Sequence, residues 1–176
     1  MSVKEQVRRL WATCFHDSEA FMDLYFGCRY ADSLNEYMES DGQVMAALQR
    51  IPYRLTYEGM NVPVAYISGA CTHPAYREQG VMRKLLAQAH QEGVLFSTLI
   101  PAEEWLKGYY ARSGYTLCFQ RRKKLLTASC LPVENFPNRW KLVEIPPKSA
   151  LCGDAFRFYD HFQSDCENCI QHNWED

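Results

Sequence analysis

The fold is decided by the stretch Thr72-His73-Pro74-Ala75-Tyr76-Arg77-Glu78-Gln79-Gly80-Val81-Met82-Arg83-Lys84-Leu85-Leu86. Strand propensity stops at Pro74, a polar turn follows as far as Gly80, and a helix begins directly after that glycine. Apolar residues then recur at helical spacing, at Met82, Leu85, Leu86 and Ala89. The stretch therefore predicts a strand, a turn and a helix in immediate succession.

The turn has the features of an anion-binding site. Backbone amides at a helix N-terminus have no intrahelical partner, and the positive end of the helix dipole lies behind them. Gly80 allows the backbone to approach a phosphate closely, and Arg77 and Arg83 add positive charge on either side. Many strand-to-helix turns contain a glycine and bind nothing, so the pattern alone leaves a purely structural turn open. The ligand it favours is a pyrophosphate.

The segments before this turn predict two helices and then antiparallel strands. Residues 3 to 15 carry apolar side chains at the spacing of an amphipathic helix. A second helix begins at a cap, Asp17 or Ser18, and ends near Gly27. Strands are then expected at Val44 to Leu48, Tyr53 to Tyr57 and Val62 to Thr72, with turns at Asp41-Gly42 and at Glu58 to Asn61.

The segments after the turn alternate between helix and strand. The expected order is a helix Val81 to Gln91, a strand Phe96 to Ile100, a helix Ala102 to Arg112 and a strand Tyr115 to Phe119. An antiparallel set followed by this alternation makes the sheet mixed, and the fold class α/β, or α+β in some schemes. Prolines interrupt the rest of the chain, where a strand Arg139 to Ile145 and a short helix Ala155 to Gln163 are expected.

Length and composition restrict the class of protein. The chain has 176 residues, of which 47% are hydrophobic and 23% charged, which suits one domain plus an extension. A net charge of −2, with basic residues gathered only at 121 to 124, disfavours a nucleic-acid partner. The N-terminus has no apolar core before a cleavage site, and no run approaches the roughly 18 apolar residues of a membrane span. We therefore expect a cytoplasmic protein without a membrane partner.

The eight cysteines are expected to be reduced thiols, many of them buried, because no secretion signal accompanies them. Cys166 and Cys169 have the spacing of metal ligands, and His172 follows three residues later. A single pair of this kind is a weak zinc signal, and thiols in a helical C-terminal stretch explain it more simply. We predict no metal site, with a zinc-binding regulator as the alternative.

Two motifs resemble the GNAT superfamily of N-acetyltransferases. In the first, Tyr76 to Leu86, an arginine (Arg77) is followed three residues later by Gly80, as in the acyl-CoA-binding motif of that family. In the second, Tyr109 to Tyr115, Tyr110 stands four residues before a glycine-aromatic pair. Met82 departs from the family pattern, which has glycine or alanine there, and we expect crowding at this position but not loss of binding.

Within the superfamily, the sequence most resembles the first half of the enhanced-intracellular-survival (Eis) type of acetyltransferase. The likeness is carried by Ile51 to Tyr57, Val62 to Ala65 and Ala70 to Pro74. It covers residues 3 to 124 at the level of the fold and is specific between about 51 and 115. The resemblance implies a mixed, mostly antiparallel sheet flanked by helices, with splayed central strands that hold acetyl-CoA.

The resemblance also implies roles for particular residues. The backbone of Ala70, Cys71 and Thr72 would pair with the pantetheine arm like an added strand, and a backbone amide in the splay would stabilise the oxyanion. Tyr110 would donate a proton to the departing thiolate, because a phenol with a pKa of about 10 is protonated at working pH. The pyrophosphate would be held by the turn and the first residues of the helix, namely Arg77, Glu78, Gln79, Gly80, Val81, Met82 and Arg83.

Three questions about the site stay open in the sequence. A general base could act through water from Glu103, Glu104 or His73. Cys71 would suit a covalent mechanism, but an apolar strand raises the pKa of a thiol and makes it inert. The aromatic residues of the first two helices line an acceptor pocket or belong to the core; they are Trp11, Phe15, Phe21, Tyr25 and Phe26.

The sequence thus divides into an acyl-CoA-binding acyltransferase domain, residues 1–124, and a C-terminal extension, residues 125–176. In the branch resembled here a second related half follows, and Trp140 to Ile145 is similar to its beginning, so one interpretation is a truncated chain. The expected activity is transfer of acetyl from acetyl-CoA to an amine of a small molecule or peptide. The rival is a non-catalytic module of the same fold that binds CoA as a sensor or scaffold; homo-oligomerisation stays open.

Overall fold

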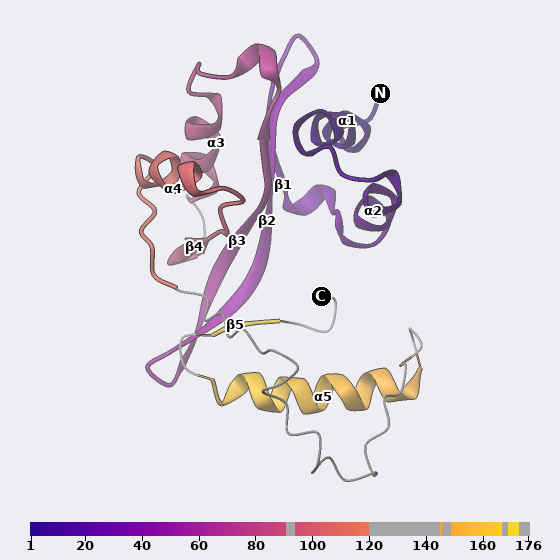
Figure 1. Cartoon of the computed structure of the whole chain (residues 1–176), viewed down its shortest axis with the longest axis vertical. Helices are drawn as coiled ribbons and strands as arrows, with labels where there is room; N and C mark the ends of the chain where they lie inside the picture. The colour runs from indigo at the N-terminus through magenta and orange to yellow at the C-terminus, as the bar shows by residue number, and fades with distance from the viewer. Residues whose placement is uncertain (91–93, 120–144, 146–148, 167–168, 173–176) are drawn as a thin grey trace, which may run out of the picture.

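The chain is arranged as one sheet with helices on both of its faces (Figure 1). The structure is a computed structural model and describes residues 1–90, 94–119, 145, 149–166 and 169–172. On one face lie α1 (Val3–Phe15) and α2 (Glu19–Leu24); on the other lie α3 (Val81–Ala89) and α4 (Glu104–Ala111). No helix within these ranges is both long and apolar enough to cross a membrane.

The sheet follows the order of the chain. Its strands are β1 (Asn35–Ser40), β2 (Gln43–Tyr57), β3 (Met60–Thr72) and β4 (Phe96–Thr98), and β5 (Ile170–Gln171) pairs with β2 beyond the end of β1. All neighbours are antiparallel except β3 and β4, which are parallel. The predicted fold, a mixed and mostly antiparallel sheet flanked by helices, is confirmed.

Tight turns connect the first three strands. Asp41 and Gly42 have φ of 51° and 75°, and Glu58 and Gly59 have φ of 49° and 71°. Positive φ at both central residues is the type I′ geometry, whose twist matches that of a β-hairpin. These turns make β1, β2 and β3 consecutive antiparallel neighbours, as the sequence predicted.

β2 corrects one expectation, because it is a single strand where the sequence suggested two, Val44 to Leu48 and Tyr53 to Tyr57. It continues through Pro52, which cannot donate a ladder hydrogen bond. Pro52 falls after the last β1 pair, at Gln49, and before the first β5 pair, at Arg54. One edge of β2 has no partner there in the described ranges, so a residue without an N–H is tolerated.

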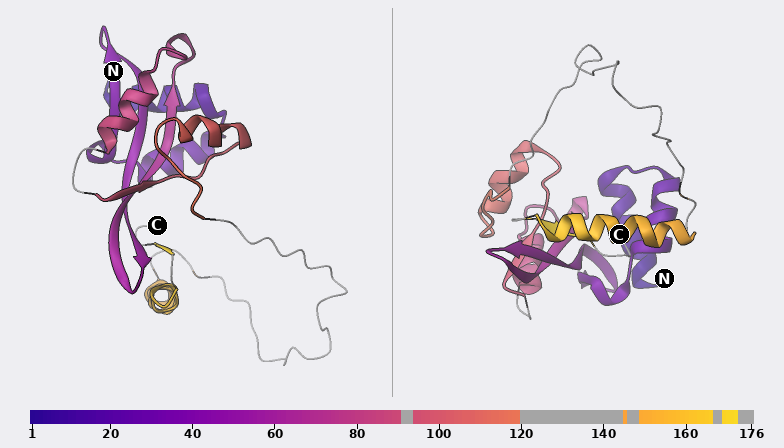
Figure 2. Two further views of the ribbon diagram at one scale, coloured as in Figure 1. Left: turned by 90° about the vertical axis from the view of Figure 1, so that its left-hand side faces the viewer. Right: turned by 90° about the horizontal axis from the view of Figure 1, so that it is seen from below.

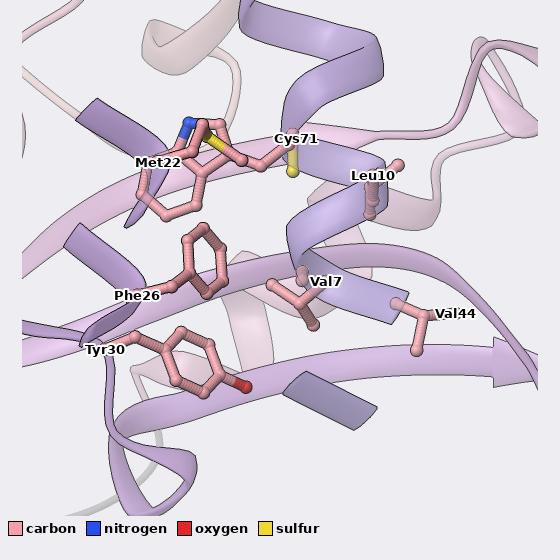
Figure 3. Close-up of a cluster of buried hydrophobic side chains, with 9 residues drawn as sticks. Val7, Leu10, Met22, Phe26, Tyr30, Val44 and Cys71 are labelled. Carbon is pink, nitrogen blue, oxygen red and sulfur yellow. The ribbon is translucent and has the colours of Figure 1, made fainter. Parts of the chain in front are cut away.

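The core has two parts, one on each face of the sheet. Alternation along the strands sends Ala46 to one face and Ala47 to the other. The part beneath α1 and α2 is rich in aromatic residues (Figure 3) and consists of Val7, Leu10, Trp11, Met22, Phe26, Tyr30, Val44, Ala47 and Cys71. The part beneath α3 is aliphatic and consists of Ala46, Leu48, Ile67, Val81, Met82, Leu85, Leu86 and Ala89.

Caps fix the starts of the two N-terminal helices. Ser2 and Glu5 form a reciprocal capping box on α1, with hydrogen bonds of 2.8 and 3.3 Å. Ser18, not Asp17, caps α2 by accepting a hydrogen bond from the amide of Phe21. The helical path passes the predicted end at Gly27, because a π-helical turn, η1 (Tyr25–Arg29), follows α2 directly. A short 3₁₀ turn, η2 (Asp32–Leu34), then leads into β1.

Other boundaries also differ from the predictions. β1 was not expected, since its sequence is polar, and residues 115–119 form no strand. Leu117 and Phe119 are 69% and 50% exposed, and no strand of the described ranges offers 115–119 a ladder, without which β-propensity has no effect. α5 (Ala150–Ser164) starts earlier than its predicted counterpart and lies beneath the far end of the β2–β3 hairpin (Figure 2). The expected strand Arg139 to Ile145 lies, except for Ile145, outside the described residues.

Candidate active site

β3 extends beyond its parallel neighbour, and this opens one of its edges. β4 pairs with β3 only at Val64 to Tyr66. β3 continues as far as Thr72, so beyond Tyr66 this edge has no partner strand in the part of the chain that the structure describes. Backbone groups on such an edge can pair with an extended ligand, as an added strand would. The predicted residues Ala70 to Thr72 lie on this open segment.

A β-bulge shapes the open segment, and the sequence analysis did not identify it. Gly69 and Ala70 of β3 together lie opposite the single residue Leu48 of β2. Gly69 has φ +59°, and a Cβ atom there would lie 2.7 Å from the Trp11 ring. Both the conformation and the close packing therefore require glycine. An isolated glycine inside a strand pattern is the signal that could have revealed it.

The turn after β3 leads directly to an uncapped helix end. The 3₁₀ turn η3 (Pro74–Tyr76) follows the strand, and Gly80 is the N-cap of α3 with φ 75°. Gly80 has no side chain to cap the first amides of α3, and a Cβ built there would meet nothing within 4 Å. The first amides of α3 therefore lie at the positive end of a helix dipole with open space beside them, which suits a phosphate.

The side chains of this turn divide between the core and the surface. Val81 and Met82 are buried in the aliphatic core, 9% and 6% exposed, so Met82 points away from the turn. The crowding that its size suggested is therefore absent from the phosphate side. Glu78, Gln79 and Arg83 are exposed. Glu78 has φ 62°, an unusual conformation for a residue with a side chain.

Arg77 points back toward β3 and the end of α1. Its Nε donates a hydrogen bond to the Thr72 carbonyl at 3.2 Å, and its Nη2 lies 3.7 Å from the Cys14 sulfur. The Cys14 thiol also reaches the Thr72 carbonyl, at 3.4 Å. The end of β3 is thus joined to α1 through one arginine and one thiol. Sequence reasoning placed Arg77 at the phosphate but missed Cys14, because the two are distant along the chain.

Tyr110 comes from α4 and packs among other tyrosines. Its ring centre lies 5.3 Å from that of Tyr109 and 5.7 Å from that of Tyr115. Burial, with smaller contributions from these tyrosines and from Cys71, raises the pKa of Tyr110 to about 12. Tyr110 and Ala70 pack against the same aliphatic core, so α4 places this tyrosine on the α3 face of the sheet. The phenol is therefore protonated at neutral pH, which suits an acid and not a base.

A triangle of hydrogen bonds holds the segment after α4. The Ser97 hydroxyl lies 2.6 Å from His90 Nε2 and 2.8 Å from the Tyr115 hydroxyl, and His90 lies 3.0 Å from Tyr115. These three residues come from β4, the end of α3 and the segment after Gly114. Burial lowers the pKa of His90, which favours the neutral ring. The triangle fixes Tyr115 and, through ring contact, supports Tyr110.

No single residue stands out as the general base. His73 accepts a hydrogen bond from the Ala75 amide at 3.3 Å. Glu103 accepts one from the Trp105 indole, and Glu104 pairs with Lys107 at 2.6 Å. All three candidates are exposed, and the structure gives none of them a preference.

The aromatic residues of the first helices separate into two sets. Trp11 and Phe26 are buried, 6% and 3% exposed, and belong to the core. Phe15 and Phe21 are 39% and 44% exposed. The Tyr25 hydroxyl lies 3.5 Å from the Ser68 hydroxyl of β3. The core interpretation therefore holds for Trp11 and Phe26; Tyr25 is partly buried and packs against the same core, and Phe15 and Phe21 reach the surface.

The C-terminal cysteines make local contacts. The Cys166 thiol faces the Phe162 carbonyl at 3.4 Å, and the Cys169 thiol faces the Ile170 carbonyl at 3.5 Å. The backbone carbonyls of both cysteines accept hydrogen bonds from Thr56 of β2. Within the described ranges, no group of three or more histidine, cysteine, aspartate or glutamate residues is placed to hold a metal. These contacts attach the C-terminal segment to the sheet.

The open edge of β3, the uncapped start of α3 and Tyr110 of α4 are the features that the sequence predicted for an acyltransferase. Residues 2–118 match the family described as the acetyltransferase (GNAT) domain. The chain belongs to this GNAT acetyltransferase family, as the two motifs predicted, and the acyltransferase class follows at the family level. Among curated proteins no match is found.

Solved structures show the same fold. A GCN5-related N-acetyltransferase from Anabaena variabilis is similar at a TM-score of 0.53 and 22% identity, covering 61% of this chain and 28% of that one. AAC(6')-Iy, in complex with a CoA-containing bisubstrate analogue, is similar at 0.51 and 18%, covering 69% and 92%. Eis1 from Mycobacterium abscessus is also a neighbour, at 0.43 and 14%, covering 49% and 22%. The chain spans about a quarter of the length of the Anabaena protein.

Proposed function

We propose that this chain transfers the acetyl group of acetyl-CoA directly to an amine. One juxtaposition carries the proposal: the open edge of β3 continues, through η3, into the uncapped start of α3. An extended chain with a pyrophosphate at its end has the shape to follow this path, because the edge offers backbone hydrogen bonds and the helix start offers free amides. Acetyl-CoA has that form.

In this proposal each predicted residue has a place along the path. The backbone of Ala70, Cys71 and Thr72 pairs with the pantetheine arm. The turn from Arg77 through Glu78 and Gln79 presents Gly80, where open space admits a phosphate. The amides of the first helical turn, at Val81, Met82 and Arg83, bind the pyrophosphate, and the exposed Arg83 side chain adds positive charge.

The chemistry requires a proton at sulfur and the loss of one at nitrogen. The amine attacks the thioester carbonyl, a C–N bond forms, and the C–S bond breaks. Tyr110 donates to the departing sulfur, and its pKa of about 12 keeps it protonated through the neutral and mildly basic range. The nitrogen proton leaves by way of water, since no single base is distinguished. Holding both reactants in line supplies the rest of the rate enhancement.

The domain boundary and the acceptor belong to the same proposal. Residues 1–124 form the acyltransferase domain and residues 125–176 an extension. The acceptor, a small molecule or peptide with an amine, approaches from the side of α1 and α2. Phe15, Phe21 and Tyr25 are the partly exposed aromatic residues of that side.

Replacing Tyr110 with Phe tests the catalytic part. The matched control is Tyr109→Phe, which removes a hydroxyl from the adjacent ring on the same helix. CoA release from acetyl-CoA is measured chromatographically with a panel of primary amines, and acetyl-CoA affinity is measured by calorimetry. We expect Tyr110→Phe to lower turnover about 10²-fold with little change in affinity, and Tyr109→Phe to behave like the wild type.

The same experiment separates the enzyme from its rival. A non-catalytic sensor would bind acetyl-CoA and release no CoA with any amine, and Tyr110→Phe would leave its behaviour unchanged. A third outcome is that the wild type turns over and that Tyr110→Phe is as active as Tyr109→Phe. The chain would then be an enzyme, but Tyr110 would have no part in its mechanism.

A further inference from the structure

Two cysteines from distant parts of the chain meet where α1 ends against β3. Cys14 lies in the last turn of α1, half-buried, and Cys71 lies on β3, 5% exposed. Figure 3 shows the Cys71 sulfur directed from the strand toward the helix. Cys14 packs against the aromatic core to which Cys71 belongs, and each thiol shifts the pKa of the other. The acetyl transfer proposed above uses neither side chain.

A fixed cation lies beside this pair. The Arg77 guanidinium is held by its hydrogen bond to the Thr72 carbonyl, and this places Nη2 3.7 Å from the Cys14 sulfur. A positive charge and hydrogen-bond donors at this distance stabilise a thiolate. The Cys14 sulfur can therefore donate to the Thr72 carbonyl as a thiol, or accept from Arg77 once its proton is lost.

The two thiols differ in acidity for this reason. The interaction with the Cys71 thiol, followed by the hydrogen bond from Arg77 and the charges of Arg77 and His73, lowers the pKa of Cys14 to about 6 despite partial burial. The interaction with Cys14 and the burial of its own side chain raise the pKa of Cys71. At neutral pH we therefore expect Cys14 to be mainly a thiolate and the buried Cys71 to be a thiol.

We propose that Cys14 is a modification site for peroxides, with Cys71 as its resolving thiol. The Cys14 thiolate attacks one oxygen of a hydroperoxide; an S–O bond forms, the O–O bond breaks, and the departing oxyanion takes a proton from water. Cys14 is thereby oxidised to a sulfenic acid and the peroxide is reduced to an alcohol or water. The Cys71 sulfur then attacks the Cys14 sulfur, the S–S bond forms, and water leaves with the Cys71 proton.

The product crosslinks two layers of the fold. The disulfide joins the last turn of α1 to the C-terminal end of β3, just before η3 begins. It also removes the thiolate from beside Arg77, whose Nε keeps its hydrogen bond to the Thr72 carbonyl. The modification therefore acts at the junction between the N-terminal helix and the turn that leads to α3.

Peptide mapping of the full chain after brief treatment with hydrogen peroxide tests the proposal. Free thiols are blocked under denaturing conditions, and Cys28 and Cys118, both exposed, are the internal comparison. We expect a Cys14–Cys71 disulfide in the wild type, a Cys14 sulfenic acid trapped by dimedone in Cys71→Ser, and neither product in Cys14→Ser. Oxidation of Cys14 no faster than that of Cys28 and Cys118 would overturn it, as would a Cys14 disulfide to another cysteine.

The rate of alkylation supplies a second measurement, which the wild type alone can contradict. With iodoacetamide at pH 7, Cys14 should react about threefold faster than Cys28, because its larger thiolate fraction outweighs its lower intrinsic nucleophilicity. The rate should rise with pH around a midpoint of about 6. Arg77→Gln should raise that midpoint. A midpoint above pH 8 in the wild type contradicts the proposed thiolate, whatever the variants do.

Discussion

The helices on the two faces of the sheet pack through different kinds of side chain. On the α1 and α2 side the Trp11 ring is the hub, with its centre 4.4 Å from that of Tyr25 and 5.3 Å from that of Phe26. On the α3 side the contacts are aliphatic, and Leu85 and Ala89 have no exposed surface at all. The aliphatic side carries tyrosines with hydroxyl groups at its margin, where the β3 edge opens.

The contrast shows where chemistry can be placed in this fold. Interlocking aromatic rings close one face, and the bulge at Gly69 depends on that closure because Trp11 lies against it. Next to the other face lie the open edge of β3 and the uncapped start of α3, so backbone amides and carbonyls are available for hydrogen bonds there. β3 contributes side chains to both parts of the core, and its open edge is where we propose that the ligand binds.

The largest loss of stability is expected from the aliphatic face. Leu85→Ala removes a side chain with 0% exposure from the contact between α3 and the sheet. We expect the free energy of unfolding to fall by about 2–5 kcal/mol, through lost burial and the cavity left behind. Urea denaturation measures it, with the exposed neighbour Lys84→Ala as a control that should change stability by less than about 0.5 kcal/mol. Equal effects of the two substitutions would show that α3 is not packed as described.

A somewhat smaller loss is expected where the aromatic face meets the bulge. Gly69→Ala places a Cβ 2.7 Å from Trp11 at φ +59°. Overpacking and backbone strain together should lower the free energy of unfolding by about 2–4 kcal/mol. Gly42→Ala has a similar φ of +75° but open space around it, so strain alone should cost about 1 kcal/mol. If the two variants unfold at the same urea concentration, the contact with Trp11 has no energetic weight.

The smallest effect is expected at the N-cap of α2, a helix that packs on the aromatic face of the sheet. Ser18→Ala removes the acceptor for the Phe21 amide, whose hydrogen bond is 3.3 Å long. The expected loss is about 1 kcal/mol. Asp17→Ala is the control, since Asp17 was the other candidate cap and makes no such bond to Phe21; it should be nearly neutral. A larger loss from Asp17→Ala than from Ser18→Ala would reverse the assignment of the cap.

The sequence predicted the elements whose periodicity was strong, and missed those that depend on a partner. The helix after Gly80 and the long strand ending at Thr72 have one clear pattern each, and both are present as α3 and β3. β1 is polar because it is an edge strand with alternating exposure, so only its pairing with β2 reveals it. Residues 115–119 have strand propensity but no described ladder.

The residues of the candidate site show the same difference between local patterns and contacts that depend on a partner. Its motifs are continuous in sequence, so Gly80 and Tyr110 could be proposed from their resemblance to the GNAT motifs. Contacts between distant segments could not be predicted: the Cys14 thiol beside Arg77 joins the end of α1 to the turn that leads to α3. Gly69 lies between these cases, because its isolation within a strand was visible but its contact with Trp11 was not.

The most direct test of the central claim, that the open β3 edge and the start of α3 bind acetyl-CoA, is isothermal titration calorimetry of three proteins. Gly80→Ala and Gly80→Glu share the strain of φ 75° and a Cβ that meets no heavy atom within 4 Å, but only glutamate adds further bulk and negative charge. The account predicts binding by the wild type, a modest weakening in Gly80→Ala and a loss of about 100-fold or more in a folded Gly80→Glu. Wild-type affinity in Gly80→Glu, or no binding by the wild type, would contradict it.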